Sequence, residues 1–175
     1  MKINSTIMKT KISTVIYIIF GFIAGIIFSG VVISISTGEM LVKEIKSPSD
    51  FDKTVSLMSD RINAAEGWHV TAIIDQNHEV ITNGGYPIGN FNIIKYCSGS
   101  YSADMLSADD RKKIGSMMPK SFAVYEKSDG QVYVSTSNGA VMGKLFGGEI
   151  ETIIEKVSLE VEDMMRFMNL KFTLF

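Results

Sequence analysis

An uncharged stretch near the start of the chain limits what this sequence can fold into. Residues 12–38 read ISTVIYIIFGFIAGIIFSGVVISISTG and contain no Asp, Glu, Lys, Arg, His or Pro. At a rise of about 1.5 Å per residue, roughly 20 apolar residues cross the hydrocarbon core of a bilayer. The stretch is longer than this, so the sequence predicts one transmembrane helix over residues 12–38.

The charges on either side of this stretch predict its orientation. Lys2, Lys9 and Lys11 precede it without any acidic residue, whereas the residues that follow it are mixed in sign. Because cationic flanks stay on the cytoplasmic side during insertion, we expect a cytoplasmic tail over residues 1–11 and an extracytoplasmic C-terminal part. The alternative is a cleaved signal peptide. The stretch is longer than the about 7–15 residues of a signal core and no Ala-x-Ala site follows it, which favours an uncleaved signal anchor in the cell membrane.

The expected membrane helix carries a stripe of small residues. Gly21, Gly25 and Ser29 are spaced four apart and therefore share one helix face. Small residues at this spacing let two helices approach closely, so we expect this face to pack against a second helix.

The remainder of the chain is long enough for one folded domain and is mildly acidic. The whole chain has 17 Lys plus Arg and 19 Asp plus Glu, and without the three lysines of the tail 14 basic residues face 19 acidic ones. A net charge of −5 gives no electrostatic reason to bind nucleic acid. We expect a short charged linker over residues 39–49 and a single domain over residues 50–175.

Hydrophobic periodicity and turn residues predict an α+β domain with helices on one face of a mainly antiparallel sheet. Asp50 or Ser49 caps the first helix, and Ser107 is placed to cap a turn at ADDRKKIG. The expected elements are a helix over 50–66, a strand over 68–75, a loop over 76–90 with a short strand at 79–82, a strand over 91–97, one or two short helices within 100–118, a hairpin formed by 121–127 and 131–137, a turn at 138–139 and a closing helix over 149–169.

Several short motifs resemble one known family. They are the GWHV strand start, the strand ending in Cys97, Met118-Pro119, Val124-Tyr125-Glu126, Asp129-Gly130 and Asn138-Gly139. Over about residues 51–169 the chain resembles the domain-of-unknown-function 302 family. The resemblance implies a small α+β domain that tends to dimerise, with no established activity. The candidate ligand-binding residues are His69, His78 and Tyr125.

The chain also departs from the pattern of that family at two positions. Ser98-Gly99 stands where many members have Asn-Pro after the strand cysteine, and Lys120 stands where many have a second cysteine. These departures argue against a two-thiol mechanism.

Cys97 is the candidate catalytic residue. It is the only cysteine and falls between a strand and a predicted helix start, where backbone N–H groups can stabilise a thiolate. The alternative is a small buried apolar residue, a common environment for free cysteine.

A metal or haem site would have to use His69, His78 and a methionine or Cys97. The two histidines are nine positions apart, unlike the tight pairs of zinc motifs, and the chain has no Cys-x-x-Cys-His for covalent haem attachment. The methionines of the last helix fall among its apolar positions, as core residues do. We therefore predict no metal and no cofactor, and keep metal or haem binding as an alternative.

Together these observations favour a non-enzymatic, membrane-anchored binding or accessory module. We expect its partners to be the lipid bilayer and either a second copy or a membrane protein complex. The alternative from the enzyme class is a thiol-dependent redox or sulfur-handling protein that uses Cys97.

Overall fold

The N-terminal part of the chain is one long helix. The structure, a computed structural model, describes the backbone of residues 3–172 and the side chains of residues 14–30, 38 and 40–172. Helix α1 spans Ile3–Leu41. Over the residues that are described, no helix combines the length and the apolar character that crossing a bilayer requires. Residues 12, 13 and 31–37 of the expected span lie outside the described side chains.

The chain forms two compact units, residues 1–39 and 40–175. The second unit begins earlier than expected, because the segment predicted to be a linker contains a strand, β1, at Val42–Lys46. Its side chains alternate between half-buried and exposed, with Ile45 packed against the core. The prediction of a linker over residues 39–49 was therefore wrong for these residues.

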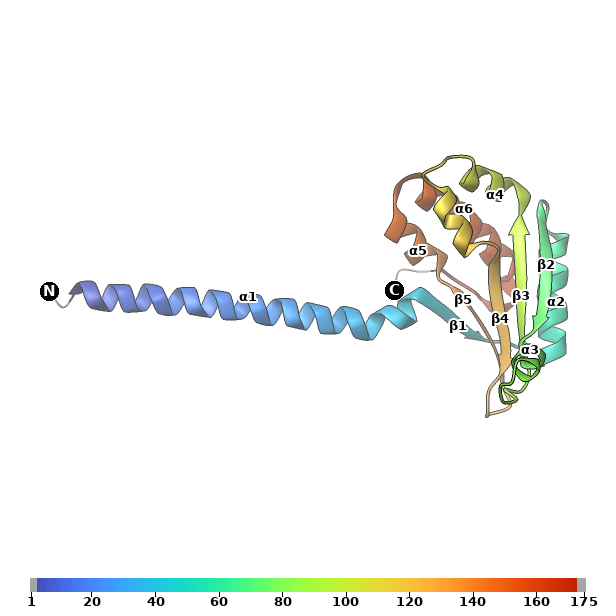
Figure 1. The fold of residues 1–175 in the computed structure, drawn as a ribbon, viewed down its shortest axis with the longest axis horizontal. Helices are drawn as coiled ribbons and strands as arrows, with labels where there is room; N and C mark the ends of the chain where they lie inside the picture. Colours follow the sequence, from blue (N-terminus) through green and yellow to red (C-terminus); the bar gives the residue numbers. More distant parts are fainter. Residues whose placement is uncertain (1–2, 173–175) are drawn as a thin grey trace. The chain divides into compact units, whose positions relative to one another are not determined.

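The second unit contains a five-stranded antiparallel sheet with strand order β1-β5-β4-β3-β2, shown in Figure 1. The other strands are β2 (Trp68–Asp75), β3 (Phe91–Ser98), β4 (Lys120–Glu126) and β5 (Val132–Ser137). All four agree with the predicted strands. The hairpin of β4 and β5 turns at Lys127–Gln131, where Gly130 has φ 72°.

Helix α2 (Phe51–Ala64) begins and ends for local reasons. The Asp50 side chain accepts a hydrogen bond from the Lys53 N–H, as predicted for a helix cap, and satisfies one of the unpaired donors of the first turn. After the helix the backbone turns at Gly67, which has φ 76°. This left-handed conformation is open to glycine and allows the chain to enter β2 directly.

The loop predicted between β2 and β3 contains a helix, α3 (Gln76–Thr82), in place of the short strand expected at residues 79–82. Asp75 caps it by accepting a hydrogen bond from the His78 N–H. None of its residues is buried, so no apolar stripe marks this helix in the sequence.

Two short helices follow β3, as expected. They are α4 (Gly99–Leu106) and the 3₁₀ helix η1 (Lys112–Met117). Ser107 does not cap the second of these. It lies at the end of α4, donates a hydrogen bond to the Asp104 carbonyl and accepts one from Arg111. The prediction for Ser107 was therefore wrong, because the Arg111 side chain bridges this corner.

The turn predicted at Asn138-Gly139 is the start of helix α5 (Gly139–Phe146). Helix α6 (Gly148–Met164) follows, and the 3₁₀ helix η2 (Arg166–Met168) completes the predicted closing helix. Two glycines let α5 approach α6: a Cβ on Gly139 would lie 1.9 Å from Ser158 Oγ, and one on Gly143 would lie 3.5 Å from the Glu151 carbonyl oxygen.

The core lies between one face of the sheet and helices α2 and α6. It includes Met58 and Ile62 of α2. It also includes three methionines at the end of the chain: Met164 of α6, Met165 directly after it, and Met168 of η2. The methionines predicted to be core residues are therefore confirmed as such. A smaller cluster of Met105, Ile114, Ile150 and Ile153 joins α4, η1 and α6. The α+β class and the antiparallel sheet are confirmed.

Candidate functional site

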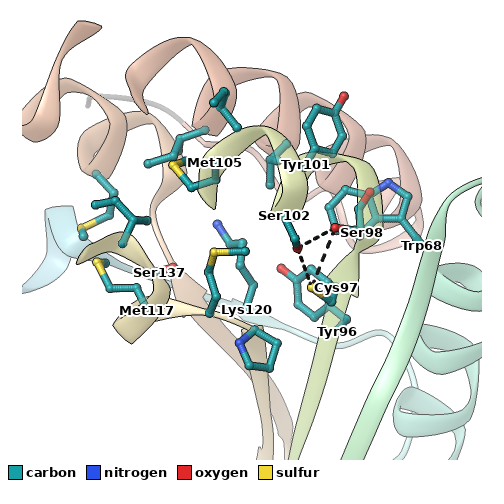
Figure 2. Close-up of a pocket in the computed structure, with 17 residues that line it drawn as sticks. Trp68, Tyr96, Cys97, Ser98, Tyr101, Ser102, Met105, Met117, Lys120 and Ser137 are labelled. Carbon is teal, nitrogen blue, oxygen red and sulfur yellow. Dashed lines mark hydrogen bonds between the residues drawn. The ribbon is translucent and has the colours of Figure 1, made fainter. Parts of the chain in front are cut away.

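A cavity of about 90 Å³ lies where the ends of β3, β4 and β5 meet α4, η1, α5 and α6. One water molecule needs roughly 10–15 Å³ of such space, so the cavity has room for a small organic molecule. Figure 2 shows its lining side chains converging from the sheet and the helices above it. They are Trp68, Tyr96, Cys97, Ser98, Tyr101, Ser102, Met105, Ile114, Met117, Met118, Pro119, Lys120, Ser137, Met142, Ile153, Ile154 and Val157.

Lys120, the first residue of β4, is the one charged residue in this lining. It is half-buried, and Figure 2 shows its ammonium group inside the cavity. Burial lowers the pKa of Lys120 from 10.5 to about 8, because a low-dielectric environment disfavours the charged form. The Lys120 ammonium lies over the face of the Phe172 ring, whose centroid is 5.8 Å from the nitrogen. The site therefore holds a desolvated cation.

The Cys97 thiol lies on the cavity wall and is half-buried. Ser102 Oγ donates to the Ser98 carbonyl at 2.7 Å, and Cys97 Sγ lies 3.0 Å from Ser102 Oγ. Because the single proton of the Ser102 hydroxyl is directed to Ser98, the Cys97 S–H can donate to Ser102 Oγ or, at 3.8 Å, to the Ser98 carbonyl oxygen. The thiol is thus held in the cavity wall by contacts with Ser102 and with the Ser98 carbonyl.

Trp68 and Tyr101 form an aromatic wall that is fixed by one carboxylate. The Trp68 Nε1–H donates to Glu160 at 2.6 Å and the Tyr101 hydroxyl donates to the same carboxylate at 2.5 Å. The hydrogen bond to Glu160 is the main reason why the pKa of Tyr101 is raised to about 12. The two ring centroids are 5.9 Å apart. Glu160 itself is not part of the cavity lining.

Tyr96 is buried at the floor of the cavity and stacks on Phe122, with ring centroids 4.9 Å apart. Its hydroxyl has no hydrogen-bond partner of ordinary geometry among the described residues. Burial raises the pKa of Tyr96, and the nearby Thr136 hydroxyl opposes this in part. The Thr136 hydroxyl itself donates a hydrogen bond to the Ser121 carbonyl. The Tyr96 hydroxyl is thus buried and makes no hydrogen bond of ordinary geometry among the described residues.

The structure brings together two of the residues proposed as metal or haem ligands, His69 and Cys97, and places His78 at the other end of β2. His69 and Cys97 are direct partners across β2 and β3, so they share one face of the sheet. His78 follows the other end of β2, in α3, where its ring lies 3.5 Å from Thr82 Oγ1. Both histidines are exposed. No group of three or more His, Cys, Asp or Glu side chains in the described part of the chain is placed to hold a metal ion.

Tyr125 lies on the sheet face opposite the core. It stacks between Phe91 and Tyr133, with ring centroids 5.2 and 6.4 Å away, and donates a hydrogen bond to Glu44. Burial, followed by this hydrogen bond, raises the pKa of Tyr125. Tyr125 does not line the cavity, so the structure does not bring it together with Cys97.

The small residues of α1 stay a prediction. Gly21, Gly25 and Ser29 are exposed, and among the described residues no atom outside the backbone of the helix lies within 4 Å of where a Cβ on either glycine would stand. This face is free to be approached by another helix.

Sequence reasoning missed Lys120, Tyr96 and Ser102 as site residues. For Lys120 a signal was present: Lys120, Phe122 and Val124 alternate along β4, so all three face the core side of the sheet. A lysine in phase with a buried strand face is uncommon, because lysine is almost never buried unless it is paired.

The family described as "Domain of unknown function DUF302" matches residues 43–168. The chain belongs to the DUF302 family. The match begins within β1, which agrees with the place of this strand in the folded unit. A crystal structure of an uncharacterised conserved DUF302 protein from Bacillus stearothermophilus is similar, with a TM-score of 0.64 and 13% sequence identity over 74% of this chain and 98% of that chain. At this identity the likeness concerns the DUF302 fold alone. No curated protein matches the sequence.

Proposed function

We propose that this DUF302 protein is a membrane-anchored, extracytoplasmic binding module that holds a small, mainly apolar molecule in the cavity beside Lys120. One observation carries the proposal: the cavity is lined mainly by apolar and aromatic side chains and contains a single charged group. Binding sites for small molecules commonly have this composition, with a few polar groups that orient the ligand.

The anchor is supported by the sequence and by the exposed surface of α1. Large apolar side chains of α1 from Val15 to Phe28 are at least half exposed, and water is an unfavourable environment for such a surface. Protease added to sealed spheroplasts is the test. It should remove residues 40–175 and leave a membrane-bound N-terminal fragment. Full protection of the domain in sealed cells, or its release without protease, would refute the anchor and its orientation.

A binding role fits the Cys97 geometry better than a nucleophilic role, because the hydrogen-bond partners of the thiol are the Ser102 hydroxyl and the Ser98 carbonyl, and neither of these groups is a general base. The test is a titration of the full chain, in phosphatidylcholine nanodiscs, with a small neutral probe such as hexanamide. Trp68 is the only tryptophan and lines the cavity, so its fluorescence should report binding.

A matched pair of variants locates the binding site. Ser137 lines the cavity and is exposed, so Ser137→Phe can narrow the cavity without adding volume to the core. We expect Ser137→Phe to weaken the binding of hexanamide and Ser137→Ala to leave it unchanged. Equal affinity in both variants would place the probe elsewhere.

A thiol-dependent function is the second candidate, because Cys97 lies on the wall of the same cavity. As the only cysteine, it can be followed in the full chain with iodoacetamide. Alkylation near pH 7 that is faster than for a free thiol, and that is blocked by a bound ligand, would favour this candidate. Slow alkylation would leave the binding role.

Self-association, or attachment to a membrane protein complex, is part of the proposal. The stripe of Gly21, Gly25 and Ser29 supports close packing of α1 against another helix. Crosslinking in native membranes tests it, with Gly21→Leu and Gly25→Leu as variants that block such packing. The loss of the crosslinked species in these variants would support the stripe as the contact, and its persistence would exclude it.

A further inference from the structure

We propose that the cavity selects small anions with an apolar body, such as short monocarboxylates, and that the Lys120 ammonium group binds the anionic end. The inference concerns the ligand class of the site described above and therefore rests on the proposed function.

The first support is that Lys120 has no anionic partner. Every ion pair recorded among the described residues uses another basic group, and these are Arg111, Lys112, Lys127, Lys144, Arg166 and Lys171. Within the same residues Lys120 has no recorded side-chain hydrogen bond either, and its contact is the face of the Phe172 ring. Its charge is thus left for something that enters the cavity.

The second support is the energetic cost of this arrangement. A cation in an apolar environment is unfavourable unless it is paired and hydrogen-bonded. The lowered pKa of Lys120, which burial alone causes, reflects the same cost. An apolar residue of similar length at this position would avoid it, so the lysine needs a reason other than the stability of the fold.

The third support is a second polar group next to Lys120, the buried Tyr96 hydroxyl. Tyr96 and Lys120 are direct partners across β3 and β4, and both side chains enter the cavity. Paired positions on one face of an antiparallel sheet have Cβ atoms about 4.5–5.5 Å apart. The buried Tyr96 O–H also makes no hydrogen bond of ordinary geometry among the described residues. A carboxylate offers two acceptor oxygens, which suits two neighbouring donors.

The remaining walls exclude other ligand classes. The lining contains no Asp or Glu, so nothing in it offsets the positive charge of Lys120 and a cationic ligand would be repelled. Methionine, isoleucine and aromatic side chains make up most of the surface, which favours an apolar body. With about 90 Å³ available, the ligand is a molecule of fewer than roughly ten non-hydrogen atoms.

Three probes of similar shape distinguish the contribution of the ligand's charge to binding from that of its apolar chain. Hexanoate, hexanamide and hexylammonium differ in their head group and are titrated at pH 7 into the full chain in phosphatidylcholine nanodiscs. Trp68 fluorescence and calorimetry report binding. Because hydrogen bonds to charged groups are the stronger class, we expect hexanoate to bind at least about tenfold more tightly than hexanamide and hexylammonium to bind more weakly than either.

Variants of Lys120 assign the preference to its charge. Lys120→Met should bring the ratio of the hexanoate and hexanamide affinities to about one, whereas Lys120→Arg should keep hexanoate preferred. Lys113→Met, at an exposed lysine in η1, is the matched control and should retain the wild-type ratio. An unfolding curve for each variant confirms that it is folded.

The outcomes distinguish this inference from the proposed function. Equal binding of hexanoate and hexanamide to the wild-type chain would overturn the anion selectivity and leave the cavity as a site for neutral molecules. A preference for hexanoate that survives in Lys120→Met would also overturn it. Binding of neither probe would refute both proposals.

Discussion

Replacing Lys120 by methionine should stabilise the domain, and the gain can be worked out from the structure. Burial lowers the Lys120 pKa from 10.5 to about 8 in the folded state. A change of one unit in the pKa corresponds to about 1.4 kcal/mol, so the buried charge lowers the free energy of unfolding by about 3 kcal/mol at pH 7. Methionine has a similar length and no charge, so Lys120→Met should recover most of this amount.

The stabilisation by Lys120→Met should decrease as the pH rises. Below about pH 8, Lys120 is protonated in both the folded and the unfolded states. The buried charge then lowers the free energy of unfolding by the full amount. Between about pH 8 and 10.5 the folded state releases its proton first, so the stability of the wild-type chain rises with pH. The difference between Lys120→Met and wild type should therefore fall to about half of its pH 7 value by pH 9.5, by the same linkage.

Urea unfolding of the full chain in nanodiscs, followed by Trp68 fluorescence at pH 6–9.5, measures this difference. Lys113→Met is the control, and its effect should stay within about 0.5 kcal/mol at every pH because the side chain is exposed. A Lys120→Met variant that is less stable than wild type at pH 7, or a difference that does not change with pH, would refute the reasoning. It would mean that the ammonium group is solvated or paired.

Three further predictions concern the scaffold around the cavity. Asn138→Ala should lower the free energy of unfolding by about 1–3 kcal/mol in urea titrations, because this side chain is fully buried and donates a hydrogen bond to the chain before β1. Gly139→Ala should lower the free energy of unfolding by about 1–3 kcal/mol, because its Cβ would stand 1.9 Å from Ser158 Oγ. Adding Ser158→Ala should restore part of this loss, and no restoration would place the strain elsewhere. Glu160→Gln should bring the Tyr101 pKa from about 12 back toward its ordinary value of 10.0, seen by ultraviolet titration of tyrosine, and an unchanged pKa would exclude the Glu160 hydrogen bond as the cause.

The sequence predicts best the elements whose signal is local. Strands β2 to β5 alternate apolar and polar residues and are bounded by turn residues, so their positions could be predicted. Helix α3 could not, because it buries no residue and therefore has no apolar periodicity; the Asp75 cap alone marks it. Helix α5 was not predicted because its glycines were interpreted as turn residues, whereas Gly139 allows close packing against α6. Strand β1 was hidden because it lies at the sheet edge and carries charges.

The candidate site was predictable only in part. Cys97 could be identified because it is the single cysteine and follows an apolar run, and the structure places it at the cavity. The partners that give the site its chemistry come from distant segments, since Lys120 meets Tyr96 through strand pairing and Trp68 meets Tyr101 through Glu160. No local pattern shows that the Lys120 ammonium lacks an anion, because this depends on everything packed around it.

The pairing of β1 with β5 has a consequence for how the protein is made. Lys46 pairs with Tyr133, so the strand that leaves the ribosome first among the five has as its sheet partner the strand that leaves last. During synthesis β1 must wait, unpaired, until Ser137 has emerged, while the strands between them can already associate. The nascent domain therefore exposes a free strand edge for most of its translation, and its final closure comes late and depends on a contact that is distant along the chain.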